Sequence, residues 1–94
     1  MITELIDLEN YLMTLEAKGF KFKDEAISFI YFGKQSTGTD DYIVSLAIEL
    51  TLKTQKRFDG SFYLSILERL KEHNIKTKTE AYGLMEKMGL KAHK

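Results

Sequence analysis

Hydrophobic residues recur along most of this chain at intervals of three and four positions, which is the spacing of an amphipathic α-helix. Leu5, Leu8, Leu12 and Leu15 follow this spacing near the N-terminus. Polar and charged residues fill the positions between them, and the chain contains no proline that would break a helix. The pattern predicts an all-α fold.

Capping and loop-forming residues divide this pattern into five helices, because Ser, Thr, Asp and Asn favour helix N-caps whereas Gly and Asn favour the C-terminal ends. The predicted helices cover residues 3–18, 24–34, 40–57, 61–73 and 79–88, with residues 34–38 forming a loop. Thr77 and Glu80 have the spacing of a capping box at the start of the last helix. We therefore expect one domain over residues 1–94, a compact bundle of four main helices plus a short C-terminal helix.

The second and third predicted helices are apolar nearly all round, which is typical of buried helices or of helices docked against a partner. We expect these two helices to form the centre of the bundle. The predicted core residues are Leu5, Leu12, Ile27, Ile30, Ile43, Ala47, Leu50, Ile66, Leu67, Leu70 and Leu84.

These two helices also carry more large apolar side chains than a core of this size needs. The candidate interface residues are those that cannot all point inward, namely Phe29, Tyr31, Phe32, Tyr42 and Val44. An exposed apolar patch of this kind marks an interface, and Tyr and Phe are favoured interface residues. The sequence thus predicts a protein-interaction or adaptor module that binds another protein or itself as a homodimer. The alternative, that both helices are sandwiched within the monomer, stays open.

The composition is that of an ordinary globular domain, with 94 residues, 44% hydrophobic and 30% charged residues, and zero net charge. The absence of cysteine excludes disulfides and thiolate zinc sites. The first residues lack the basic start of a signal peptide, and the longest apolar stretch, residues 29–32, is too short to cross a bilayer. We expect a cytoplasmic protein that does not bind membranes.

Charge is distributed unevenly between the two halves of the chain. Residues 1–50 carry nine acidic residues and four lysines, whereas residues 51–94 carry ten basic residues and five acidic ones. The alternative function is therefore a nucleic-acid-associated regulator, whose phosphate contacts would be Lys71, Lys76, Lys78, Lys87 and Lys91. The overall pI of about 6.7 argues against it, because nucleic-acid-binding domains are usually strongly basic.

No motif predicts catalysis or cofactor binding. Gly33-Lys34-Gln35-Ser36 lacks the first glycine of a P-loop and the hydroxyl directly after the lysine. The pair Asp40-Asp41 lacks the alternating carboxylates of a calcium loop, and first-turn helix acids explain it. His73 and His93 belong to no metal-binding pattern. We expect a protein that is not an enzyme and that has no catalytic residue, metal ligand or cofactor.

Overall fold

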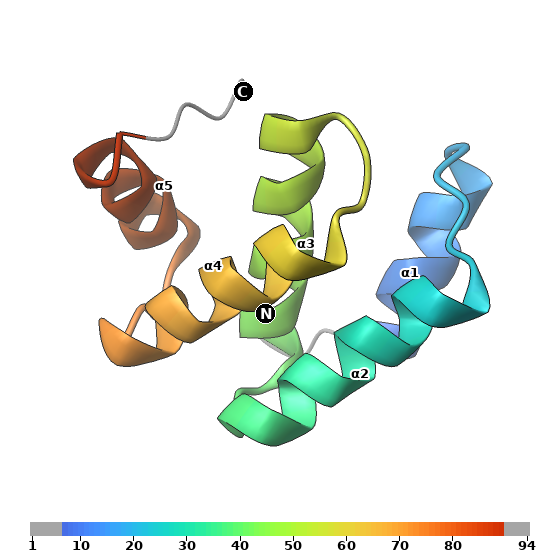
Figure 1. Cartoon of the computed structure of the whole chain (residues 1–94), viewed down its shortest axis with the longest axis horizontal. Helices are drawn as coiled ribbons and strands as arrows, with labels where there is room; N and C mark the ends of the chain where they lie inside the picture. The colour runs from blue at the N-terminus through green and yellow to red at the C-terminus, as the bar shows by residue number, and fades with distance from the viewer. Residues whose placement is uncertain (1–6, 90–94) are drawn as a thin grey trace, which may run out of the picture.

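The computed structural model describes residues 7–89, and over this range the chain forms five α-helices and no strand. The helices are α1 (Leu8–Ala17), α2 (Asp24–Thr37), α3 (Asp41–Gln55), α4 (Gly60–Glu72) and α5 (Lys78–Lys87). They pack into a single all-α globule, which confirms the predicted fold class (Figure 1).

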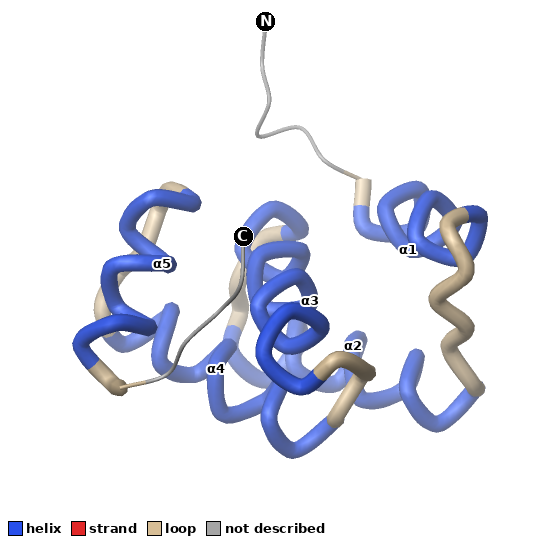
Figure 2. Tube along the Cα trace, turned by 90° about the horizontal axis from the view of Figure 1, so that it is seen from above, coloured by secondary structure: helices blue, strands red, loops and turns tan. Residues whose placement is uncertain are grey.

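Helix α3 forms the centre of the fold. Nine of its fifteen residues are buried, because α4 crosses it and α1 and α5 lie on opposite sides of it (Figures 1 and 2). Helix α2 lies at the periphery against α4 and buries only Ile30, Gly33 and Thr37. The prediction that the second and third helices share the centre is therefore wrong for α2. Helix α4, whose buried stripe faces both α2 and α3, fills that central place instead.

A single hydrophobic core connects all five helices. Ile30, Val44, Ala47, Ile48, Tyr63, Leu67 and Ala81 are fully buried within it. The predicted core residues are buried as expected, except that Ile27 is only partly buried and Leu5 lies outside the described residues. The apolar surplus of α3 is thus used inside the monomer.

Side-chain caps fix the starts of four helices. Asp7, Asp40, Asp59 and Thr77 each accept a hydrogen bond from a backbone N–H in the first turn of the helix that follows. Asp40 is thus the N-cap of α3 rather than its first residue. The capping box of Thr77 and Glu80 is present as predicted. The predicted start of the first helix at residue 3 lies outside the described residues, but the prediction is wrong for Asp7, which has extended backbone as the N-cap of α1.

Helix α2 continues one turn beyond its predicted end at residue 34. The Thr37 hydroxyl donates to the carbonyl oxygen of Gly33 at 2.7 Å, so a residue typical of loops is accommodated within the last turn. Gly38 then ends the helix in the left-handed conformation, with φ of 68°. The predicted loop at residues 34–38 is therefore wrong for residues 34–37.

Candidate functional site

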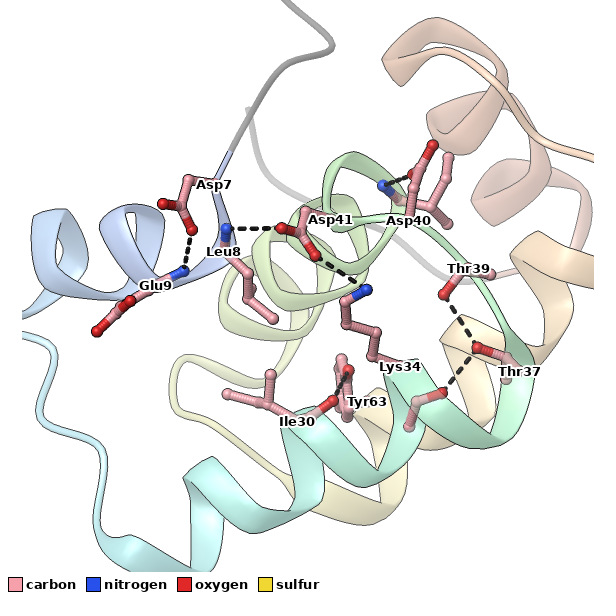
Figure 3. Close-up of polar contacts among 12 residues, drawn as sticks. Asp7, Leu8, Glu9, Ile30, Lys34, Thr37, Thr39, Asp40, Asp41 and Tyr63 are labelled. Atoms are coloured by element: carbon pink, nitrogen blue, oxygen red, sulfur yellow. Dashed lines mark hydrogen bonds and ion pairs between the residues drawn. The ribbon is translucent and has the colours of Figure 1, made fainter.

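The inner face of α2 is fixed tightly to α4. A Cβ atom on Gly33 would lie 2.9 Å from side-chain atoms of Leu64 and Tyr63, so the close approach of the two helices requires glycine here. The Tyr63 hydroxyl donates to the carbonyl oxygen of Ile30 at 2.7 Å (Figure 3). Burial raises the pKa of Tyr63 well above its ordinary value, and the phenol therefore keeps the proton that it donates.

This attachment turns the opposite face of α2 toward solvent. At helical spacing, this outer face consists of Ser28, Tyr31, Phe32, Gln35 and Ser36, all of them exposed. The side chain of Phe32 is 61% exposed and that of Tyr31 is 38% exposed. More than half of the Phe32 surface stays in solvent, so folding of the monomer buries only the smaller part of this apolar residue.

The outer face of α2 carries no charged side chain, although 30% of the residues in the chain are charged. Acidic residues are confined to one end of the helix, at Asp24 and Glu25. On the flank, the Lys34 ammonium is turned to the Asp41 carboxylate at 3.2 Å. An aromatic centre without charges, bordered by charged groups, is the composition of the core and rim of a protein interface.

One edge of this face meets the N-termini of α1 and α3. Asp41 accepts a hydrogen bond from the backbone N–H of Leu8 at 3.1 Å while pairing with Lys34, and it thereby joins α1, α2 and α3 (Figure 3). Partial burial and the carboxylates of Glu9 and Asp41 raise the pKa of Tyr31. Tyr31 is therefore a neutral phenol at the acidic edge of the face.

A second polar cluster holds α5 to α3. The Glu49 carboxylate accepts a hydrogen bond from the Tyr82 hydroxyl at 2.9 Å and pairs with the Lys78 ammonium at 2.9 Å, with Lys53 at 3.7 Å. Burial of Glu49 opposes ionisation, but the hydrogen bonds from Lys78 and Tyr82 outweigh that effect and lower its pKa. Glu49 is therefore ionised at neutral pH and anchors α5 to α3.

The cleft beside this cluster has a volume of about 500 Å³ and is lined by Lys53, Lys78, Thr79, Tyr82, Gly83 and Glu86. Three of its lining residues, Lys53, Lys78 and Tyr82, contact the Glu49 carboxylate. Among residues 7–89, no three His, Cys, Asp or Glu side chains are grouped so that they could hold a metal ion. Within the same residues, none of the five helices combines the length and hydropathy that a membrane span requires.

The structure separates the five residues predicted to lie at an interface. Tyr31 and Phe32 are exposed on the outer face of α2, whereas Phe29 and Tyr42 are partly buried. The ring of Phe29 lies against Gly60, where a Cβ atom would be 2.8 Å from it. Val44 is fully buried in the core, so it forms no part of a surface patch.

The structure describes four of the five lysines of the alternative function, and all four are exposed. Lys71 donates to the carbonyl oxygen of Thr37, and Lys78 pairs with Glu49. Lys76 and Lys87 are exposed, and Lys91 lies outside the described residues. Two of the four lysines that the structure describes thus serve contacts between helices.

Sequence reasoning missed both polar clusters. Tyr82 and Glu49 are 33 positions apart, as are Asp41 and Leu8, and no local spacing indicates such pairs. The uncharged outer face of α2 could have been found from the sequence, because its residues recur at helical spacing.

Comparison with known proteins gives one match. Residues 3–91 match a protein family described as "Family of unknown function (DUF6123)". No curated protein and no solved structure matches the chain.

Proposed function

The chain belongs to the DUF6123 family of unknown function, and from that premise we propose that it is a small protein-interaction module that binds through the outer face of α2. The observation that carries this proposal is Phe32, a large apolar side chain that is 61% exposed in the middle of an uncharged helical face. Burying such a ring in an interface stabilises the complex by about 1.5–3 kcal/mol. Aromatic anchors of this kind account for most of the binding energy in many interfaces.

The rigid attachment of α2 supports the same proposal. Its inner face is fixed by the close contact at Gly33 and by the hydrogen bond between Tyr63 and Ile30. A binding face on a fixed helix loses little conformational entropy when it binds a partner. The free energy of binding is therefore reduced less by the cost of ordering the helix.

Site-specific photo-crosslinking tests the proposal. A benzophenone amino acid is placed at position 32 in the full chain and irradiated in the cells that make the protein. Met13, on α1, is the matched control position, because its side chain is 58% exposed and also apolar. We expect protein adducts at position 32 that resist high salt and disappear when Gln35→Glu is added. Adducts no stronger at position 32 than at position 13 would contradict the proposal.

A further inference from the structure

The charges at the two ends of α2 indicate which partner fits this face, an inference that rests on the proposed function. We infer that the outer face of α2 pairs with the same face of a second copy of this chain, with the two helices antiparallel about a twofold axis. A twofold axis places one surface against itself, so the face has to be complementary to its own inverted copy. The residues of α2 meet this condition only when the two helices run antiparallel.

A parallel pairing would bring like charges together. Asp24 and Glu25 open α2, and in a parallel pair they would lie beside the Asp24 and Glu25 of the other copy. Four carboxylates at one end of a helix pair repel one another, and the two helix dipoles would be aligned unfavourably as well.

An antiparallel pairing relieves this repulsion. It carries the acidic end of one α2 to the C-terminal end of the other, where the Lys71 ammonium donates to the carbonyl oxygen of Thr37. That ammonium lies 3.8 Å from the position of a Cβ atom on Gly38, so it borders the end of the helix. Each copy would thus place Glu25 near Lys71 of the other, twice per dimer.

The register follows from the position of the aromatic pair. In an antiparallel twofold pair, the residue numbers of any two facing positions add up to the same value. Placing the twofold axis between Tyr31 and Phe32 fixes this value and therefore fixes every facing pair. Tyr31 of one copy then faces Phe32 of the other, and Ser28 faces Gln35. The aromatic residues of the two copies then meet at the centre of the interface. On either side of the centre, the Ser28 hydroxyl of one copy meets the Gln35 amide of the other, and no charged side chain is buried.

The interface is small. A helix of 14 residues is about 21 Å long, so one helix pair lies at the low end of specific interface sizes. We therefore expect a weak dimer whose population rises with protein concentration. Because its central contacts are apolar, added salt should change the dissociation constant little.

Disulfide trapping in the full chain tests the pairing and its direction, since the natural chain contains no cysteine. Ser28→Cys and Gln35→Cys proteins, one carrying a mass tag, are mixed and oxidised gently. The antiparallel register predicts the mixed disulfide in excess over both homodimeric disulfides. A parallel pair would give the two homodimeric disulfides instead and would overturn the inference.

Light scattering after size exclusion gives the second measurement. We expect a mass that rises from 10.9 kDa toward twice that value with concentration, for the natural chain and for Met13→Glu. Phe32→Glu should remain monomeric at every concentration. A monomeric natural chain, or equal loss of dimer in both variants, would overturn the inference.

The two proposals fail in different ways. Suppose that the photo-adducts at position 32 have a mass different from that of the crosslinked homodimer, and that the natural chain is monomeric. This result would overturn the self-pairing and leave the interaction function standing. The absence of adducts above the control at position 13 would remove both.

Discussion

The hydroxyl of Tyr63 on α4 donates to the backbone carbonyl oxygen of Ile30 on α2 at 2.7 Å, across 33 positions of sequence. That carbonyl belongs to the middle of a helix, where its lone pairs already serve the helical hydrogen bond, and the phenol adds a second donor. The contact is buried and lies beside the close approach at Gly33. Together with the contact at Gly33, it holds the side of α2 that carries Ile30 against α4, so the opposite side faces outward.

Removing this hydroxyl should destabilise the fold while leaving the packing of the ring intact. Tyr63→Phe loses a buried hydrogen bond, and we expect the free energy of unfolding to fall by about 1–2 kcal/mol. Urea denaturation monitored by circular dichroism measures the change. Tyr42→Phe, at a partly buried tyrosine of α3, is the control and should have a smaller effect. Equal effects of the two substitutions would show that the hydrogen bond to Ile30 contributes no stability.

The two helix-interior glycines at positions 33 and 83 should respond in opposite ways to alanine. In Gly33→Ala the new Cβ atom would meet Leu64 and Tyr63 at 2.9 Å, and we expect a loss of about 1–3 kcal/mol from overpacking. In Gly83→Ala the new Cβ atom meets nothing within 4 Å, and we expect a gain of about 0.5–1 kcal/mol from helix propensity. Thermal and urea denaturation of the two variants check both signs. A stabilised Gly33→Ala protein would contradict the close helix approach.

Glu49 should make the attachment of α5 sensitive to acid. Its pKa is lower in the folded chain than in the unfolded chain, so its contribution to stability is present at neutral pH. The contribution is lost as the pH falls below the ordinary carboxyl range and through the lowered pKa. We expect Glu49→Gln to be less stable than the natural chain at pH 7 and to lose less stability on acidification. Hydrogen exchange of the α5 amides should increase in this variant at pH 7. Glu86→Gln, at an exposed position on α5, is the control and should leave both properties unchanged.

The adjacent carboxylates of Asp40 and Asp41 should stabilise the first turns of two different helices. Asp40 caps α3 by accepting from Ile43 N–H at 3.0 Å, whereas Asp41 accepts from Leu8 N–H at the start of α1. We expect Asp40→Ala to cost about 1 kcal/mol and to speed hydrogen exchange in the first turn of α3. Asp41→Ala should speed exchange in the first turn of α1 instead. Identical exchange patterns in the two variants would contradict this division.

Local chemistry made the helix boundaries largely predictable from the sequence. Thr77 and Glu80 are three positions apart and form their capping box within one turn, and Asn74 adopts the left-handed conformation expected at a helix end, with φ of 54°. The end of α2 was mispredicted because Thr37 favours loops in isolation. Its hydroxyl instead bonds to Gly33 within the helix, an outcome that composition alone does not decide.

Contacts between distant segments could not be predicted in the same way. Gly33 indicates flexibility in the sequence, yet in the fold it allows two helices to touch. Val44 and Phe32 are both large and apolar, yet the packing of the helices buries Val44 and leaves Phe32 exposed. The sequence therefore pointed to large apolar residues on the second helix, but it could not tell that Tyr31 and Phe32 are exposed while Phe29 is partly buried.

The inner and outer sides of α2 are subject to different evolutionary constraints, although they belong to one helix. Substitution at Gly33 or Ile30 disturbs folding, because these positions meet α4. Substitution at Ser28, Phe32 or Gln35 alters only the surface that the helix presents. Selection can therefore change the chemistry of the outer surface while the inner positions preserve the architecture, and descendants of one ancestor can diverge in that surface without diverging in shape.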